Sequence, residues 1–189
     1  MPDFLTAEEK EILIGIARES IQSAVLKEKF APLDLENMSV RLRELGVVFV
    51  TLTYHNQLRG CIGALEPYQP LAEDVREHAV AAAMNDFRFI PIQPEELQDL
   101  NIEISCLTIP MPVEYETPSE LVELLRLNKE GVVLKDGYRR ATFLPQVWEK
   151  IHNPAEFLSQ LCQKMGAPPD LWMRKHLDVF TYQVEEFQG

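Results

Sequence analysis

The feature that most constrains this fold is a pair of strand-like segments separated by a very short polar stretch. Val47–Tyr54 is rich in β-branched and aromatic residues, which is typical of a β-strand. Leu58–Leu65 predicts a second strand, so His55-Asn56-Gln57 is predicted to be a three-residue hairpin loop. Strands joined by so short a loop pair antiparallel, and the fold is therefore expected to contain an antiparallel sheet.

The length of this loop decides which residues of the two strands face each other. A three-residue loop places Thr51 opposite Cys61 and gives the hairpin one apolar and one more polar face, because side chains alternate along a strand. A two-residue loop would place Cys61 opposite Leu52 and mix the two faces, so the three-residue loop is favoured. The predicted polar face carries Thr51, Thr53, Arg59, Cys61 and Gly63.

The second strand contains Leu58–Gly63, the segment with the clearest potential for chemistry. Arg59 and Cys61 are predicted to lie on one face with their Cα atoms roughly 7 Å apart, and a nearby cation lowers the pKa of a thiol. Gly60 and Gly63 allow another backbone or a ligand to approach closely. Cys61 and Arg59 are therefore candidate catalytic residues. The alternative is a packed, inert cysteine, since free cysteines are among the most buried residues.

A second segment of interest follows the helix that we predict over Leu71–Asn85, whose small alanine side chains would let it sit close to a neighbour such as the hairpin. The segment alternates charged and aromatic residues. We predict an ion pair between Asp86 and Arg88 that fixes the turn after the helix, with Phe87 and Phe89 in the core.

The alternative is that the charged residues of this segment line a cleft near Cys61. His78, on the preceding helix, would then be a further candidate. His78 and Asp86 are separated by eight residues, roughly 12 Å along a helix axis, so no catalytic triad is predicted. The candidate cleft or binding residues are Gly60, Gly63, Thr51, Thr53, His78, Asp86 and Arg88.

The remainder of the chain predicts further hairpins mixed with helices. Thr6–Glu9 has the pattern of a capping box at the start of a long helix, and Asp136-Gly137 is a strong signal for a second hairpin. Alternating residues over Val179–Phe187 predict one closing strand. Because hairpins imply antiparallel pairing, the predicted class is α+β, with mostly antiparallel sheets and flanking helices.

Composition excludes several classes of function. The 189-residue chain has a net charge of −12 and no basic run denser than Arg139-Arg140, so no binding to nucleic acid or to an anionic membrane surface is expected. No apolar stretch approaches the ~20 residues needed to span a bilayer. No nucleotide-binding fingerprint is present.

The cysteines predict a reducing, cytoplasmic location. Cys61, Cys106 and Cys162 are an odd number and lie far apart, so no disulfide framework is expected. Cys106 and Cys162 fall among apolar residues and are predicted to be core. Neither cysteine nor histidine shows the spacing of metal ligands, and no metal or other cofactor is predicted.

Several segments together resemble the AMMECR family. Leu58–Gly63 is similar to the family's hallmark sequence, and Ala82–Phe89 is similar to its second motif. Four further motifs follow in the family's order: Ile104–Leu107, Gly131–Leu134, Ala141–Trp148 and Phe157–Cys162. The resemblance covers nearly the whole chain, and its short length resembles the prokaryotic form, called protein A of the AmmeMemoRadiSam system.

The resemblance implies a single domain over residues 1–189, built from a larger and a smaller α+β subdomain of discontinuous chain segments. The name of the prokaryotic system implies partnership with Memo-like and radical SAM proteins. The chain has no C-x₃-C-x₂-C set, so an iron–sulfur cluster would belong to the partner.

The resemblance does not imply a reaction, and two interpretations remain open. The first is an interaction module whose Leu58–Gly63 hairpin admits a partner by strand addition. The second is an enzyme or group carrier with Cys61 as a thiolate nucleophile activated by Arg59. The absence of a visible base–nucleophile pair favours the module.

Overall fold

The computed structural model describes residues 4–189, and contacts within the chain divide it into two compact units. Unit 1 comprises the residues up to Thr108 together with Glu185–Gly189, and unit 2 comprises Ile109–Val184. Each unit has its own four-stranded sheet with antiparallel strand pairs and its own helices, which confirms the predicted α+β class.

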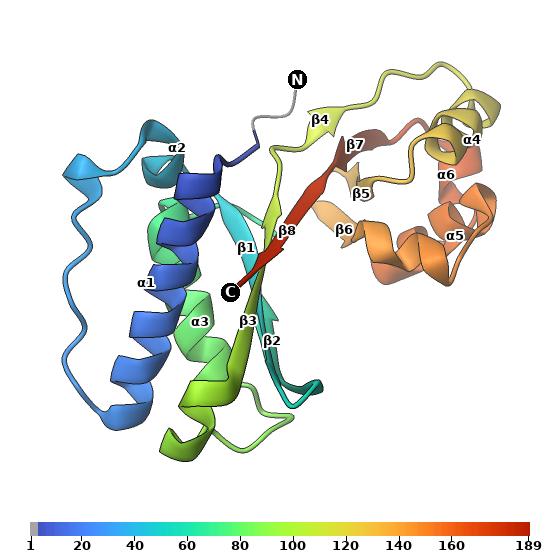
Figure 1. The fold of residues 1–189 in the computed structure, drawn as a ribbon. Coiled ribbons are helices and arrows are strands. Elements are labelled where there is room, and N and C mark those ends of the chain that lie inside the picture. The colour runs from blue at the N-terminus through green and yellow to red at the C-terminus, as the bar shows by residue number, and fades with distance from the viewer. Residues whose placement is uncertain (1–3) are drawn as a thin grey trace. The chain divides into compact units, whose positions relative to one another are not determined.

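Unit 1 is a four-stranded sheet of order β2-β1-β3-β8 with helices α1 and α3 on one face (Figure 1). Its strands are β1 (Val47–Tyr54), β2 (Gln57–Gly63), β3 (Leu100–Leu107) and β8 (Val184–Gln188). Its helices are α1 (Ala7–Leu26), α2 (Val40–Arg43) and α3 (Leu71–Met84), with 3₁₀ turns at Leu35–Asn37 and Pro94–Asp99. Because β2 ends the strand order, it is an edge strand.

Local sequence signals explain how unit 1 is built. The Thr6 side chain accepts from the Glu9 N–H and the Glu9 side chain accepts from the Thr6 N–H, so the predicted capping box at the start of α1 is confirmed. Val48, Val50 and Leu52 alternate onto the helix-covered face of β1 and are fully buried there.

Unit 2 is a four-stranded sheet of order β4-β7-β5-β6 with three helices and a separate core. Its strands are β4 (Met111–Pro112), β5 (Gly131–Asp136), β6 (Arg139–Phe143) and β7 (Asp178–Tyr182). Its helices are α4 (Pro118–Leu127), α5 (Pro154–Lys164) and α6 (Leu171–Arg174), with a 3₁₀ turn at Pro145–Glu149. The hairpin predicted at Asp136-Gly137 joins β5 and β6, and Gly137 adopts the left-handed φ of 62° that this turn requires.

The single closing strand predicted over Val179–Phe187 is wrong. The segment forms two strands, β7 and β8, which belong to different sheets. The hydrophobic alternation runs through both strands, and periodicity alone carries no information about the partner to which a strand pairs.

The predicted three-residue loop of the β1–β2 hairpin is also wrong. The loop consists of His55 and Asn56 alone, and Tyr54 pairs directly with Gln57. His55 and Asn56 have φ values of 48° and 62°. Positive φ at both central residues is the conformation of the two-residue turn whose twist matches that of the flanking strands.

The predicted pairing of Thr51 with Cys61 is nevertheless confirmed. Thr53 pairs with Leu58, and a bulge then leaves Arg59 without a partner on β1. The bulge inserts one extra residue into β2. This extra residue compensates for the loop, which is one residue shorter than predicted. The register of Thr51 and Cys61 is therefore restored.

Within residues 4–189, no helix combines the length and the apolar composition needed to cross a membrane.

Candidate functional site

Gly60 lets helix α3 pack directly on strand β2. A Cβ atom added to Gly60 would lie only 2.1 Å from the carbonyl oxygen of Ala82. The close approach predicted at Gly60 and the packing of the alanine-rich helix on the hairpin are thus confirmed, and the approaching backbone is that of α3. Since neighbouring residues face opposite sides of a strand, the Cys61 side chain points away from α3.

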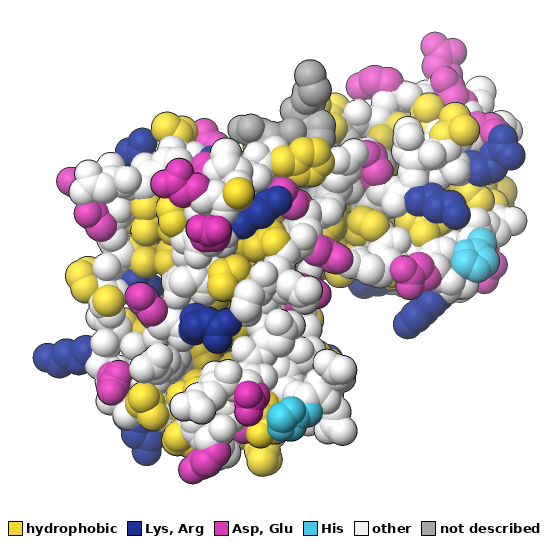
Figure 2. All heavy atoms as spheres, viewed as in Figure 1, with side chains coloured by type: hydrophobic (Ala, Val, Ile, Leu, Met, Phe, Trp, Pro, Cys, Tyr) yellow, Lys and Arg dark blue, Asp and Glu magenta, His cyan; other side chains and the backbone are white. Residues whose placement is uncertain are grey.

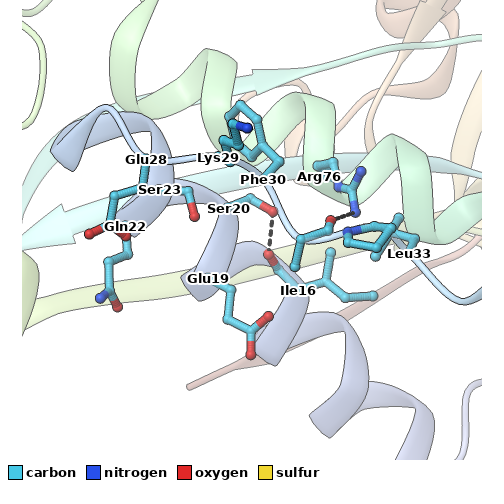
Figure 3. Close-up of a pocket in the computed structure, with 12 residues that line it drawn as sticks. Ile16, Glu19, Ser20, Gln22, Ser23, Glu28, Lys29, Phe30, Leu33 and Arg76 are labelled. Carbon is cyan, nitrogen blue, oxygen red and sulfur yellow. Dashed lines mark hydrogen bonds between the residues drawn. The ribbon is translucent and has the colours of Figure 1, made fainter.

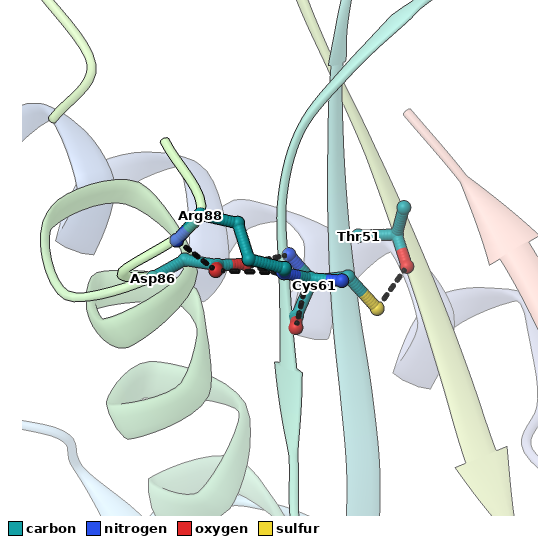
Figure 4. A network of polar contacts seen from close by, with 4 residues as sticks. All are labelled: Thr51, Cys61, Asp86 and Arg88. Carbon is teal, nitrogen blue, oxygen red and sulfur yellow. Dashed lines mark hydrogen bonds and ion pairs between the residues drawn. The ribbon is translucent and has the colours of Figure 1, made fainter. Parts of the chain in front are cut away.

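The Cys61 thiol lies on the side of the sheet opposite α3, where it meets its cross-strand partner. The hydroxyl of Thr51 donates a hydrogen bond to Cys61 Sγ at 3.1 Å (Figure 4). Cys61 is half-buried, whereas Cys106 and Cys162 are buried, as predicted. Burial raises the pKa of Cys162 and raises that of Cys106 to about 11.

Asp86 and Arg88 hold the backbone of Cys61 from the open edge of β2. The Cys61 N–H donates to Asp86 Oδ2 at 2.9 Å, and Arg88 donates to the Cys61 carbonyl oxygen at 3.0 Å (Figure 4). The two side chains also form the predicted ion pair, at 2.6 Å and 2.9 Å. Hydrogen bonds from Arg88, aided by the Cys61 N–H, hold the pKa of the Asp86 carboxyl far below its usual range.

At one position of the sheet edge, this arrangement provides hydrogen-bond partners for the backbone groups of β2. A residue of an antiparallel strand directs its N–H and C=O to the same side. At Cys61 both groups already have side-chain partners, Asp86 and Arg88. A partner strand could pair at Cys61 only by displacing them, so the strand-addition form of the module interpretation is not favoured at this residue.

Arg59 does not direct its guanidinium to the thiol as the sequence predicted. It forms a bidentate ion pair with Glu96, with Nε–Oε1 at 2.7 Å and Nη2–Oε2 at 2.9 Å. It also donates to the carbonyl oxygen of Ile90 at 3.2 Å. The bulge takes Arg59 out of the strict alternation that would place it beside Cys61. The hydrogen bonds from Arg59 lower the pKa of Glu96.

Large apolar side chains lie exposed next to these two ion pairs. The prediction that Phe87 packs in the core is wrong, because its side chain is 94% exposed, while Phe89 is half-buried. Ile90, whose carbonyl holds Arg59, is 72% exposed, and Leu58, which precedes Arg59, is 43% exposed. We call Leu58, Phe87 and Ile90 the Phe87 surface.

The remaining predicted site residues have other environments. Thr53 accepts a long hydrogen bond from Asn101 at 3.5 Å. A Cβ atom on Gly63 would lie 2.5 Å from the ring of Phe49, so this glycine accommodates an aromatic side chain.

His78 belongs to a separate buried cluster under β1. Its Nδ1 lies 3.2 Å from Oδ2 of the buried Asp74 but lacks the geometry of a hydrogen bond. Asp74 Oδ2 instead accepts the N–H of Val48 at 2.9 Å. His78 therefore does not supply a base to Cys61 through any contact among residues 4–189.

Sequence reasoning missed Glu96. It lies 37 positions from Arg59, and long-range pairs leave no periodic trace. The one local signal is the 3₁₀ turn that holds it, where Glu96 accepts from the N–H of Gln93 in a capping box.

The groups in this region that could take part in chemistry or binding are the Cys61 thiol and the ion-paired side chains at the edge of β2. Among the residues that the structure describes, no group of three or more His, Cys, Asp or Glu side chains is placed to hold a metal ion. On the face seen in Figure 2, Lys and Arg side chains lie scattered among Asp and Glu and do not gather into one basic area.

Comparison with known proteins gives consistent matches over nearly the full chain. The model of the AMMECR1 family matches residues 14–187. The protein MK0488 of Methanopyrus kandleri is 37% identical over 196 residues, covering 100% of this chain and 92% of that relative. A protein of Methanothermobacter thermautotrophicus is 38% identical over 186 residues, covering 97% of this chain and 95% of the relative.

A solved structure shows a similar fold. The crystal structure of the uncharacterized protein PH0010 from Pyrococcus horikoshii matches with a TM-score of 0.75 and 32% identity. The match covers 97% of this chain and 93% of that one.

Proposed function

This chain belongs to the AMMECR1 family, and from that premise we propose that it is an interaction module which docks onto Memo-like and radical SAM proteins. The docking site would be the Phe87 surface beside the β1–β2 hairpin. The proposed partners come from the resemblance to the prokaryotic AmmeMemoRadiSam form, and the proposed surface comes from the geometry of unit 1.

The observation that carries this proposal is the exposure of Phe87 within an otherwise fixed turn. Its two neighbours, Asp86 and Arg88, are tied to each other and to the backbone of Cys61. Phe87 therefore cannot enter the core without breaking that network, and its side chain stays 94% exposed. Rigid exposed aromatic residues bind partners at a low entropy cost and are enriched in protein interfaces.

The second ion pair extends the same argument to the neighbouring loop. Arg59 joins β2 to Glu96 and to the carbonyl oxygen of Ile90. Ile90 and Leu58 are thereby held at the surface next to fixed polar groups. An apolar centre with a polar rim is the usual anatomy of a docking surface.

Binding to purified partners tests the proposal. Phe87→Ser should weaken the binding of the Memo-like or radical SAM protein from the same organism at least about tenfold, as expected of a hot-spot residue. Tyr138→Ser is a matched control, because Tyr138 of unit 2 is 96% exposed and lies outside the Phe87 surface. Equal affinities for the two variants and the unaltered protein would reject this surface.

A second candidate function, thiol chemistry at Cys61, rests on one specific observation. Cys61 is the cysteine that is not buried, and its sulfur already accepts a hydrogen bond from Thr51. The candidate is placed second because neither Arg59 nor His78 is bonded to this thiol. Loss of function in Cys61→Ser with partner binding intact would favour it.

A further inference from the structure

We propose that a groove between helix α1 and the 3₁₀ turn Pro94–Asp99 binds a monocarboxylate with an apolar chain, of the fatty-acid type. The turn lies beside the C-terminal half of α1 in unit 1 (Figure 1), and Leu100 and Ile102 of β3 complete the lining. Glu96 of the same turn does not line the groove and pairs instead with Arg59. This α1 groove therefore shares no residue with the Phe87 surface.

The α1 groove has the volume and the wall of a site for a small apolar molecule. Its volume is about 460 Å³, within the ~300–1,000 Å³ typical of ligand pockets. Six of its nine lining residues are apolar. Ile21, Leu100 and Ile102 belong to the core of unit 1, so this part of the wall is fixed by packing. Leu26 is 40% exposed, and a bound apolar chain would remove some of this surface from water.

Arg18 supplies the charge of the α1 groove. Among the described residues that line the groove, it is the one that carries a charge, and its side chain is exposed and thus accessible to a ligand. The structure shows no ion pair or hydrogen bond from Arg18 to another described residue. Glu95 and Asp99 of the 3₁₀ turn do not line the groove. A planar guanidinium matches a carboxylate in both charge and shape.

The combination of one cation with an apolar wall selects the ligand. A monocarboxylate balances Arg18, and its chain covers the apolar lining. Gln22 lies one helical turn after Arg18 on the same side of α1, and its amide can donate a further hydrogen bond to the carboxylate. An amine of the same length would place its charge against that of Arg18, and an uncharged alcohol would leave Arg18 unpaired.

A further pocket of unit 1 provides a useful contrast. It lies beside α1 and α3, and its lining contains two anions, Glu19 and Glu28, and two cations, Lys29 and Arg76 (Figure 3). The Arg76 guanidinium already donates to the carbonyl oxygen of Ala31 at 2.8 Å. Because the charges of this lining balance, it offers no preference for a ligand of one sign and serves as an internal reference.

Titration of the unaltered protein with matched probes tests the proposal without any mutation. Octanoate, 1-octanol and 1-octylamine share one chain and differ in the head group, whereas acetate has the carboxylate without the chain. Methyl NMR should show that octanoate shifts the signals of Ile21 and Leu97 and binds at least about tenfold more tightly than each of the other probes. The signals of Ile16 and Leu33, which line the reference pocket, should stay in place.

Three results of this titration would overturn the proposal. The first is the absence of any shift at Ile21 and Leu97 with millimolar octanoate. The second is equal binding of 1-octanol or 1-octylamine, since the charge of Arg18 would then select nothing. The third is an equal shift of the reference pocket, which would mean that octanoate binds apolar surface without selection.

Variants then locate the carboxylate and the chain. Arg18→Gln should weaken octanoate binding about tenfold or more and leave 1-octanol binding unchanged. Leu97→Asn should weaken the binding of both probes, because it places a polar group in the apolar wall. Arg43→Gln is the matched control, since Arg43 is exposed in unit 1 and does not line the groove. Unchanged octanoate binding in Arg18→Gln, or an equal loss in Arg43→Gln, contradicts the assignment of the carboxylate to Arg18.

Discussion

The carboxylate of Asp86 accepts a hydrogen bond from the backbone N–H of Cys61 at 2.9 Å, across 25 positions of sequence. Together with Arg88, it gives an edge-strand residue the two partners that a neighbouring strand would otherwise provide. The same contact fixes the turn that exposes Phe87. One pair of residues therefore both protects the sheet edge and shapes the proposed docking surface.

Removal of the Asp86 carboxylate should destabilise unit 1. Asp86→Ala leaves the Cys61 N–H and the Arg88 guanidinium without their partner, and Asp86 is only 4% exposed. A loss of about 1–3 kcal/mol in the free energy of unfolding is expected in chemical denaturation. Glu123→Ala is the control, since it removes an exposed ion pair of 2.7 Å with Arg126 and should cost less than about 1 kcal/mol. Equal losses would contradict this role.

The Asp86 interaction should weaken at low pH. Its pKa is depressed in the folded protein, so its contribution is complete above the unfolded pKa of about 3.9 and declines as the pH falls towards the folded value. The stability difference between the unaltered protein and Asp86→Asn should therefore be constant from pH 7 to 5 and roughly 1 kcal/mol smaller at pH 3. A difference that grows on acidification would show that the pKa is not lowered.

A side chain at Gly60 should separate α3 from β2. Gly60→Ala would place its Cβ against the Ala82 carbonyl oxygen, and such overpacking costs typically about 1–3 kcal/mol of stability. Gly15→Ala is a control of opposite sign, because Gly15 lies within α1 with no atom within 4 Å of an added Cβ. It should stabilise the protein by about 0.5–1 kcal/mol. If the stability of Gly60→Ala were unchanged, α3 would not pack closely against β2 at this position.

Native alkylation should discriminate among the three cysteines. Iodoacetamide at pH 8 should label Cys61 first, because burial raises the pKa values of Cys106 and Cys162. Mass spectrometry of the digested protein identifies the labelled residue, and unfolded protein gives the reference in which all three react. Arg59→Met should leave the rate of Cys61 labelling unchanged, since Arg59 pairs with Glu96. Slower labelling in this variant would restore the thiol-activating role predicted from the sequence.

Those parts of the fold that rest on local signals could be predicted from the sequence. The capping box of Thr6 and Glu9 and the turn at Gly137 follow from short-range hydrogen bonding and backbone freedom. The prediction that Thr51 pairs with Cys61 across the hairpin is correct, but the loop length on which it rested is wrong. The true loop is one residue shorter, and the bulge at Arg59 compensates for it, which alternation alone cannot detect.

The candidate site could be predicted only in outline. The ion pair of Asp86 and Arg88 has a local signal, but the pairing of Arg59 with Glu96 depends on how distant segments fold together. Aromatic residues usually signal core, and the exposure of Phe87 breaks that rule because its two neighbours are engaged at the strand edge. Departures from a local rule of this kind are expected at functional surfaces.

The most direct test of the docking proposal compares Phe87→Ser with Cys61→Ser in one calorimetric titration against a Memo-like protein, the proposed partner. The proposal predicts that Phe87→Ser weakens binding at least about tenfold and leaves the stability of the protein within about 0.5 kcal/mol. Cys61→Ser should bind with unchanged affinity. Unchanged binding in Phe87→Ser, together with loss of binding in Cys61→Ser, would contradict the proposal and make the thiol the centre of the site.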